Sequence, residues 1–490
     1  MAQKISRDEL KPKLEPHFWQ CLDDLQYEIV PQKASRLLSF NRLDIAIKAL
    51  FLEFLEDRPD FSERLYAAHL KCFTLGSFKE PGNPQKDSLR SYVQEFEAIH
   101  QSLQKRGFDS TQSLIPLGKD GTILNGAHRV AAALACDRNV FAVTLPIADS
   151  MYDYRFFLGR GMSRTEVELA VSEFIELQSN CYIACVWPRA EGKGTELDSL
   201  FQKVVYKKSL KLSYKGAYNF LAEVYEGETW LGSRETRFAG VKGKLVECFA
   251  GEGELRAYAF QSDSLEDVVK LKAEIRELFG VGKHSVHITD THDEAVRISR
   301  LLFNENSLHF LEFGDPYAFK DTFDKIEQFG SVLDRAGVER RDAMLDASIV
   351  LSLYGLREAR DLDFLSTKDL GQTPKDLDPH DSELKFHGKK KADLLFDNSF
   401  FFYYRNIKCV SLPQLAAMKR NRLEEKDIRD LDLMAPLLDK DGSSLSRKGL
   451  QKVLFMRAKF KHLIIQALRK FLLYGFARTA YRFLRGRKSG

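Results

Sequence analysis

The sequence predicts a multidomain α/β protein in which α/β and α+β parts follow one another along the chain. A chain of 490 residues exceeds the usual size of one domain, about 100 to 200 residues. Short apolar segments with the two-residue period of strands alternate with segments of helical spacing. The composition, with 44% hydrophobic and 29% charged residues, is typical of a globular protein. We expect five regions, with these bounds: 1–80, 81–180, 181–335, 336–440 and 441–490.

Residues 1–80 are expected to form a helical N-terminal region. Residues 41–55 carry apolar side chains on nearly every side of a helix, which predicts a mostly buried helix. The first ten residues include acidic side chains and no apolar core, so we expect no secretory signal. The seven cysteines are scattered without a zinc-type spacing, which favours the reducing cytoplasm.

The region 81–180 contains a pattern suited to phosphate binding. Residues 113–118 predict a strand, a hairpin turn follows, and a helix is expected to begin beside His128. Gly126 lets the backbone approach a ligand closely, and the first turn of the helix adds amide donors. We expect His128 and Arg129 to supply further donors to a phosphate.

This pattern resembles the Gly-x-His-Arg box of the ParB/sulfiredoxin-like fold, over about residues 80–146. The matching residues are Gly126, His128 and Arg129, and Asn125 stands where kinases of this fold often have an acidic residue. The resemblance implies that these four residues bind the phosphates of ATP or another nucleotide. A small-molecule or sugar kinase is therefore one candidate function.

The central region, 181–335, is expected to be a mixed α/β domain. The pattern predicts strands at residues 181–187, 201–208, 219–225 and 245–249. It predicts helices at residues 265–279 and 293–303.

The segment between those two helices allows three interpretations. It contains four possible metal ligands: His284, His287, Asp290 and His292. The loop could alternatively line a substrate cleft, with Lys283 facing a phosphate or sugar. In the third interpretation it is a turn whose following helix is capped by Thr291 and Glu294. The pattern leaves these alternatives open.

In region 336–440, two alternating carboxylates indicate a Mg²⁺ site. Residues two apart on a strand point the same way, so Asp361 and Asp363 can share one cation while Leu362 and Phe364 face the core. Mg²⁺ prefers carboxylate oxygens and keeps positions open for substrate phosphates. Ser348 is expected at the start of a short helix, where amide donors attract phosphate. These groups would meet at one phosphorylated substrate.

This segment resembles the nucleotidyltransferase superfamily, in which a Gly-Ser pair precedes an Asp-x-Asp motif. Here twelve residues separate Ser348 from Asp361, and Ala347 stands in the glycine position. The order of motifs is also similar to that of the LicD/fukutin branch, which transfers phosphorylated alcohols from CDP-linked donors in surface-glycan synthesis. Tyr354, Gly355 and Arg357 match that order, and we expect a turn at Gly355 to aim Arg357 at a phosphate.

The chain downstream resembles the strand, helix and Lys-Asp-x-x-Asp closure common in the same superfamily. We expect a strand from residue 407, an N-cap at Ser411, and a helix that places Lys419 and Arg422 one turn apart to bind phosphates. A third acidic ligand is expected on a neighbouring strand. The candidates are three: Glu383, Asp393 and Asp397.

Residues 441–490 are expected to form a basic amphipathic helical tail. Thirteen of the 74 basic residues lie in 442–490, which contains no acid, so the first 441 residues carry 61 basic and 70 acidic side chains, or −9. Such a tail suits an anionic membrane surface. Docking on the acidic body or binding nucleic acid are the alternatives. We regard nucleic acid as the least favoured partner, because no helix-turn-helix pattern follows the residue 126–129 box.

Together these patterns predict a Mg²⁺-dependent phosphotransferase or nucleotidyltransferase that acts on a sugar, alditol or glycan phosphate. Asp361 and Asp363 are expected to hold the metal, Ser348 to cradle phosphates, and Arg357 and Lys419 to offset developing charge. The motif order is similar to that of uncharacterised proteins associated with bacterial capsule and O-antigen synthesis. We expect a cytoplasmic protein, peripheral to the inner face of the membrane if the tail binds lipid. The alternatives are the kinase and a non-enzymatic nucleic-acid-binding module.

Overall fold

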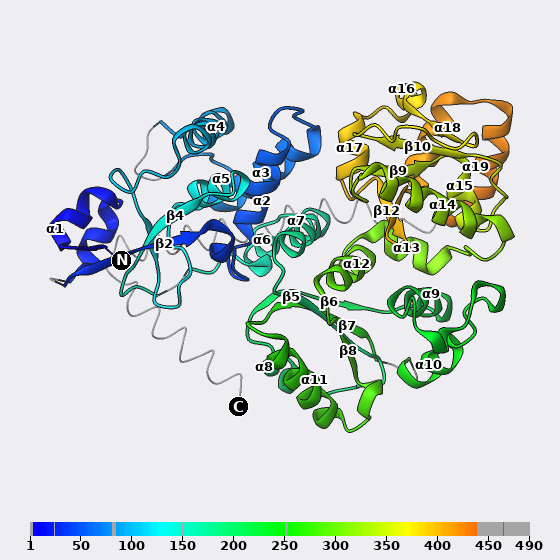
Figure 1. Ribbon diagram of the computed structural model, residues 1–490, viewed down its shortest axis with the longest axis horizontal. Helices are drawn as coiled ribbons and strands as arrows, with labels where there is room; N and C mark the ends of the chain where they lie inside the picture. Colours follow the sequence, from blue (N-terminus) through cyan, green and yellow to red (C-terminus); the bar gives the residue numbers. More distant parts are fainter. Residues whose placement is uncertain are drawn as a thin grey trace.

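The computed structural model contains three β-sheets, each covered by helices (Figure 1). Each sheet together with its helices is called a part, and the three parts are numbered in chain order. It describes residues 3–438, apart from residues 24, 81–84, 149 and 250–252, together with Ile464. Apart from Ile464, the tail predicted at residues 441–490 lies outside the described residues. The mixed helix and strand content confirms the predicted α/β class.

The first sheet has the strand order β1-β2-β4-β3. Its strands are β1 (Gln3–Ile5), β2 (Tyr27–Lys33), β3 (Ile115–Leu117) and β4 (Asn139–Thr144). The β2 strand runs antiparallel to β4, with Ile29 opposite Val143, while β3 runs parallel to β4. The first two predicted regions therefore share one sheet, and the N-terminal segment, expected to be helical, supplies two of its strands.

Helices surround this sheet and connect it to the rest of the molecule. They are α1 (Arg7–Leu10), α2 (Leu43–Glu53), α3 (Asp60–Thr74), α4 (Leu89–Arg106), α5 (Ala127–Ala135), α6 (Tyr154–Gly159) and α7 (Arg164–Leu177). The prediction of a mostly buried helix is confirmed by α2, whose buried residues include Asp44 and Lys48. These two charges pair at 2.9 Å, which offsets the cost of removing them from water.

The second sheet is antiparallel, with the order β6-β7-β5-β8. Its strands are β5 (Cys181–Val186), β6 (Val204–Leu210), β7 (Leu255–Gln261) and β8 (Val286–Ile288). Helices α8 (Gly194–Leu200) and α11 (Leu265–Phe279) cover one face, and α9 (Tyr214–Val224), α10 (Val241–Cys248) and α12 (His292–Leu302) lie on the other side. The strands expected at 181–187 and 201–208 and both expected helices are present.

Two predicted strands of this region are helices, so those predictions were wrong. Residues 219–225 lie in and directly after α9, and residues 245–249 lie in and directly after α10. In α9 the Ser213 side chain caps the first turn, and Ala217, Phe220, Leu221 and Val224 are buried. That three-and-four spacing is helical, but it begins before residue 219 and is hidden in a window that starts there.

The third sheet has the order β11-β10-β9-β13-β12. Its strands are β9 (Ala343–Asp346), β10 (Leu362–Ser366), β11 (Leu377–Pro379), β12 (Phe401–Tyr404) and β13 (Ile407–Val410). The helices of this part are α13 (Glu305–Phe313), α14 (Lys320–Ala336), α15 (Ser348–Leu353), α16 (Leu384–His387), α17 (Lys391–Phe396), α18 (Leu412–Arg422) and α19 (Glu425–Leu438). The central strand β9 is antiparallel to β10 and parallel to β13.

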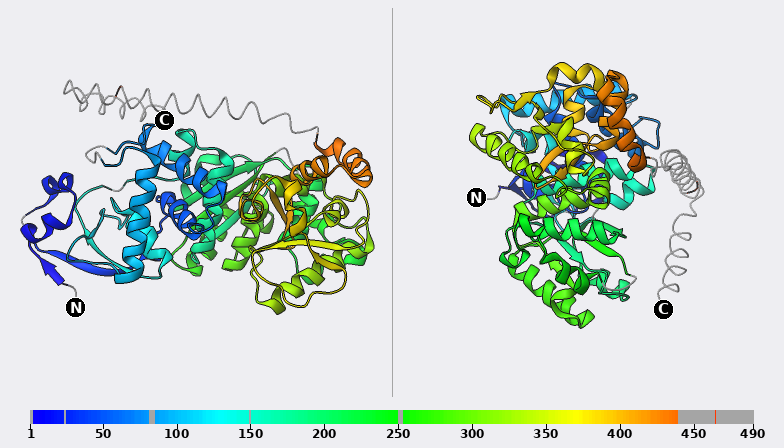
Figure 2. Two further views of the ribbon diagram at one scale, coloured as in Figure 1. Left: turned by 90° about the horizontal axis from the view of Figure 1, so that it is seen from above. Right: turned by 90° about the vertical axis from the view of Figure 1, so that its right-hand side faces the viewer.

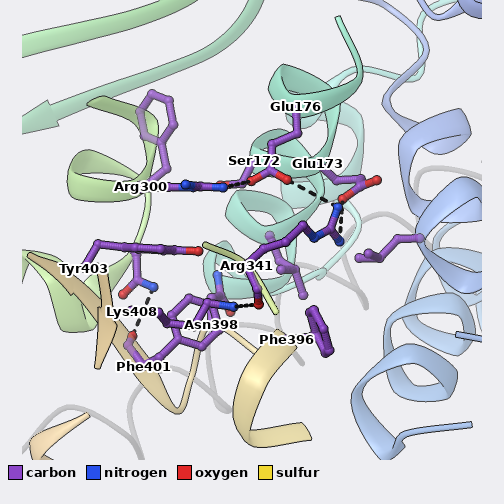
Figure 3. Close-up of a pocket in the computed structure, with 14 residues that line it drawn as sticks. Ser172, Glu173, Glu176, Arg300, Arg341, Phe396, Asn398, Phe401, Tyr403 and Lys408 are labelled. Carbon is purple, nitrogen blue, oxygen red and sulfur yellow. Dashed lines mark hydrogen bonds and ion pairs between the residues drawn. The ribbon is translucent and has the colours of Figure 1, made fainter. Parts of the chain in front are cut away.

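The first and third parts lie side by side, and the second part lies below the third in the view of Figure 1 (Figures 1 and 2). Where the three meet, buried charges surround a cavity of about 50 Å³ (Figure 3). Glu173 and Glu176 reach from α7 towards Arg341 of the third part, and Glu176 also pairs with Arg300 of α12 at 3.0 Å. Arg341 pairs with Glu53 of α2 at 2.9 Å. These ion pairs join all three parts.

Candidate functional site

Three neighbouring strands of the third sheet carry an aspartate at the same level. In the register, Asp363 of β10 lies opposite Asp346 of β9 and opposite Asp378 of β11. Residues paired across strands point to the same face of a sheet, so the three carboxylates share one face. Leu362 and Phe364 are buried, as the alternation of β10 predicts.

Asp361 joins this face from the residue before β10. It is exposed, and the Ser348 hydroxyl donates to its Oδ1 at 3.2 Å and to its backbone oxygen at 3.3 Å. The predicted convergence of Ser348 with the Asp-x-Asp segment is thus present. The helix that Ser348 begins, α15, has only six residues, so the side chain of Ser348 matters more here than the helix dipole.

The turn between β9 and α15 explains why the glycine position matters. Ala347 adopts a φ of +55° and a ψ of −123°, a region that glycine occupies without strain and alanine does not. Its N–H donates to the Asp346 Oδ1 at 2.7 Å. The tight turn brings the start of α15 beside the end of β10.

The carboxylates of this face repel one another. Burial raises the pKa of Asp363 to about 6, and the neighbouring charges of Asp361, Asp346 and Asp378 add to that rise, while His380 opposes it. Among the described residues, none forms an ion pair with Asp361, Asp363 or Asp378. A positive charge beside these carboxylates would offset the repulsion. The three-ligand group that the described residues form with atoms within 4.8 Å of one another is a different one and includes Asp346.

Arg357 does not point freely at a substrate position. Gly355 has the positive φ expected of the turn, +71°, but the Arg357 guanidinium donates to both oxygens of Asp430 in α19, at 2.6 and 2.9 Å. Arg357 is about one-third exposed, and the charge of Asp361 also lies near it. The residue is therefore close to the carboxylate face but neutralised by a partner.

Lys419 and Arg422 are likewise paired. The Lys419 ammonium contacts Asp427 at 2.9 Å and Asp430 at 2.7 Å, and both groups are buried. Arg422 contacts Asp427 at 2.8 Å and Glu383 at 3.0 Å. The Lys-Asp-x-x-Asp closure thus supplies counter-charges that hold α18 against α19, rather than leaving the cations free for phosphate.

The helix start at Ser411 also differs in detail from the prediction. Ser411 occupies the N-cap position of α18, but its hydroxyl makes no capping hydrogen bond and is buried without a hydrogen-bond partner among the described residues. The second residue of the helix is Pro413, which lacks the N–H that such a hydroxyl often receives.

The three candidates for a third acidic ligand lie elsewhere. Asp393 accepts from the Phe61 N–H at 2.8 Å, Asp397 pairs with Arg64 at 2.6 Å, and Glu383 pairs with Arg422. Asp393 and Asp397 thus bind α3 of the first part. The register instead places Asp378 beside Asp363. A second Asp-Leu-Asp triplet at residues 376–378 was the sequence signal that could have identified it.

A buried cluster around Asp346, one of the carboxylates of this face, escaped the sequence analysis. The Asp346 Oδ2 lies 2.8 Å from His380 Nδ1 and 2.8 Å from His387 Nε2. All three side chains are buried, and their ligand atoms lie within 4.8 Å of one another. The histidines come from a loop and a short helix with no periodic pattern, so the sequence carries little signal for the cluster.

The polar side chains of the residue 125–129 box already have partners within the protein. Arg129 donates to Glu15 at 3.0 Å and to the Leu114 oxygen at 3.3 Å. The Asn125 side chain accepts from the Gly126 N–H at 2.6 Å, and His128 Nε2 lies 2.9 Å from the Tyr66 hydroxyl. The predicted phosphate donors therefore already contact protein groups.

Packing and charge reinforce this closure. Gly126 has a φ of +88°, and a β-carbon there would lie 2.8 Å from the Ile115 side chain. Burial, with the charges of Lys48 and Lys86 adding to it, holds the pKa of His128 well below its usual range, so the ring is neutral. The box is a packed turn between strand and helix.

The histidines of residues 284–292 do not gather at one point. His284 contacts Glu247 at 3.1 Å, His287 contacts Glu294 at 2.8 Å, and His292 contacts the Ile175 oxygen at 2.8 Å. Thr291 caps α12 by accepting from the Glu294 N–H. The capped turn is the interpretation that the structure supports.

Comparison of the chain with known protein families, with curated proteins and with solved structures finds no match. Within the described part of the chain, no helix is both long enough and apolar enough to cross a membrane.

Proposed function

We propose that the protein is a Mg²⁺-dependent phosphotransferase or nucleotidyltransferase that acts on a sugar, alditol or glycan phosphate. The observation that carries this proposal is the face formed by Asp361, Asp363 and Asp378. Asp363 and Asp378 are neighbours in the strand register, and none of the three carboxylates forms an ion pair with a described residue. Burial, together with the charges of the neighbouring carboxylates, raises the pKa of Asp363 to about 6. Carboxylate oxygens are the ligands that a hard divalent cation such as Mg²⁺ prefers.

In this proposal Asp361 and Asp363 hold Mg²⁺, and Asp378 is the third acidic ligand. When bound, Mg²⁺ polarises a phosphoryl oxygen and offsets the charge that develops during transfer. Ser348 orients Asp361 through its hydroxyl, which donates to the Asp361 Oδ1 at 3.2 Å. Positioning and electrostatics supply most of the rate.

The paired cations limit the roles of Arg357 and Lys419. Each shares Asp430, so little positive charge remains to bind a phosphate without the metal. We propose that Arg357, which is partly exposed and near Asp361, assists the transferred phosphate. Lys419, which is buried, acts by positioning Asp430.

The donor in this proposal is ATP, CTP or a CDP-linked alditol, and the acceptor is a phosphorylated sugar, alditol or glycan of surface-polysaccharide synthesis. That choice of substrates derives from the motif resemblance alone. A mass-spectrometric screen of the purified full chain tests it, with ATP, CTP and CDP-alditols in turn, glycan acceptors, and Mg²⁺ or EDTA. A Mg²⁺-dependent gain of a phosphate-containing mass on an acceptor supports transfer.

The same screen separates the proposal from a kinase centred on residues 126–129. A kinase of that kind would keep its turnover when Asp363 is replaced by Asn. It would lose turnover in a folded Arg129→Lys variant. An absence of any mass gain with all donors and acceptors, from a protein that is folded and loaded with Mg²⁺, would count against transfer.

A further inference from the structure

We propose that Asp346, His380 and His387 form a binding site for a divalent transition metal ion of the Zn²⁺ class. The three side chains come from the end of β9, the residue after β11, and the end of α16. Both histidine nitrogens lie 2.8 Å from one carboxylate oxygen, and the three ligand atoms lie within 4.8 Å of one another. Nothing in the proposed transfer reaction requires these histidines, so the site is an additional one.

The donor set selects the class of metal. Two imidazole nitrogens and one carboxylate oxygen are the ligands that Zn²⁺ and its transition-metal neighbours prefer, and this set is found in open three-ligand sites. Mg²⁺ prefers oxygen ligands alone and gives up its water reluctantly. The buried cluster around Asp346 and the more exposed carboxylates of Asp361, Asp363 and Asp378 therefore favour different ions, although Asp346 lies directly opposite Asp363.

The surroundings hold the three ligands in place. The His380 backbone N–H donates to the Phe364 oxygen at 2.8 Å, which ties the loop to β10. The Asp346 Oδ1 accepts from the Ala347 N–H at 2.7 Å, which leaves Oδ2 for the metal. All three side chains are nine-tenths or more buried, so little ordering is needed on binding.

The orientation of the Gln414 side chain depends on whether His387 Nε2 carries a proton or a metal ion. Its Nε2 donates to the His387 oxygen at 3.0 Å and lies 3.3 Å from His387 Nδ1. This arrangement suits an imidazole whose proton is on Nε2 and is donated to Asp346. A metal on Nε2 moves that proton to Nδ1, so the Gln414 amide must turn its oxygen towards the ring. Metal binding therefore predicts a local rearrangement at Gln414.

Metal binding to the full chain tests the proposal without any measurement of turnover. The chain is stripped with a chelator and titrated with Co²⁺ or Zn²⁺, and the bound metal is measured by mass spectrometry. We expect one tightly bound ion per chain and the visible absorption of Co²⁺ with nitrogen ligands. His387→Ala and Asp346→Asn should each weaken binding by at least about tenfold.

His287→Ala is the matched control, because His287 contacts a carboxylate at the same 2.8 Å but belongs to no three-ligand group in the described part of the chain. This variant should bind metal as the natural chain does. Asp361→Asn with Asp363→Asn should also keep the transition metal. If transfer is never observed but the ion binds, the proposed function fails and this site stands.

Variants of buried residues can fail to fold, so a measurement on the natural chain completes the test. X-ray absorption of the Zn²⁺-loaded chain should show two imidazole ligands. A spectrum without imidazole ligands, no bound ion after Zn²⁺ loading, or equal binding in a folded Asp346→Asn variant would each overturn the proposal. The cluster would then be a hydrogen-bonded network alone.

Discussion

The carboxylate face of the third sheet and the residue 125–129 box of the first sheet have similar predicted roles but different surroundings. On the carboxylate face, none of the described residues forms an ion pair with Asp363 or Asp378. In the box, Arg129 is paired with Glu15 and His128 contacts Tyr66. A motif specifies which side chains are present, but their availability depends on partners supplied by distant segments.

The same contrast occurs within the third part. Asp361 and Arg357 belong to one motif, four residues apart, yet Asp361 is exposed and Arg357 is held by Asp430 in α19. The cationic residues of the predicted site are therefore paired with protein carboxylates, whereas no described residue forms an ion pair with Asp361. This asymmetry is the reason for proposing that the site binds a cation.

The largest effect is expected from removing the charges of two residues on the carboxylate face. Replacing Asp361 and Asp363 together by Asn should lower the transfer rate by at least about 10³-fold, or about 4 kcal/mol of transition-state stabilisation, because the metal loses its charged ligands. The melting temperature should stay within a few degrees or rise, since the mutual repulsion of the carboxylates is removed. Initial rates and thermal melts measure both quantities.

Asp432→Asn is the control for that experiment. Asp432 belongs to another Asp-Leu-Asp triplet, on α19, and its side chain is exposed. It should keep the full transfer rate. Equal activity of the double variant and this control would remove Asp361 and Asp363 from the mechanism.

The second prediction tests whether the box is a packed turn. Gly126→Ala should lower the free energy of unfolding by about 2–3 kcal/mol, since the new methyl group meets Ile115 at 2.8 Å in a backbone conformation that favours glycine. Gly121→Ala is the matched control, because its φ is +80° and a β-carbon there meets nothing within 4 Å. That control should cost only about 1 kcal/mol. Urea unfolding of both variants measures the difference, and equal losses would show that the box is not tightly packed.

The third prediction concerns Glu173, in the cluster of buried charges where the three parts of the molecule meet. Burial raises the pKa of Glu173 to about 8, partly offset by Arg341 and increased by Glu53 and Glu176. The folded state thus holds a proton that the unfolded state releases above about pH 4.5, so stability falls as the pH rises towards 8. Glu173→Gln should remove that dependence and stabilise the chain by on the order of 1–2 kcal/mol at pH 8.

Glu176 is the informative comparison, because Arg300 and Arg341 overcome the effect of its burial and lower its pKa. Glu176→Gln should instead destabilise the chain at neutral pH. Melting temperatures of the two variants between pH 5 and 9 measure these opposite signs. A Glu173→Gln variant whose pH profile matches that of the natural chain would contradict the assignment.

The smallest effect is expected at Ala347, in the turn before Ser348. Ala347→Gly should raise the free energy of unfolding by about 1 kcal/mol, because glycine adopts a φ of +55° without strain. Ala343→Gly, in the preceding strand β9, should lower it by a similar amount. Denaturant unfolding measures both. A destabilising Ala347→Gly would mean that the methyl contacts outweigh the strain.

Local patterns predicted the elements whose signals lie within one segment. The alternation at residues 361–364, the buried helix at 41–55 and the capping pair at Thr291 all appear where they were expected. Helix α9 was missed because its helical spacing begins at Tyr214, five residues before the segment 219–225 that was predicted as a strand. The strands β1 and β2 were missed because β2 lies beside a strand more than 100 residues later in the chain.

The sequence by itself determined the residue types, their local geometry and the charge of each segment. Carboxylates two apart on a strand must share a face, and a residue after β9 must turn sharply to begin α15. Only the tertiary structure decided which of these groups are free. Glu15 reaches Arg129 across 114 residues, and Asp430 reaches Arg357 across 73. An ion pair requires the two charges to be adjacent in space, and that adjacency follows from sheet register and helix packing, which no local pattern encodes.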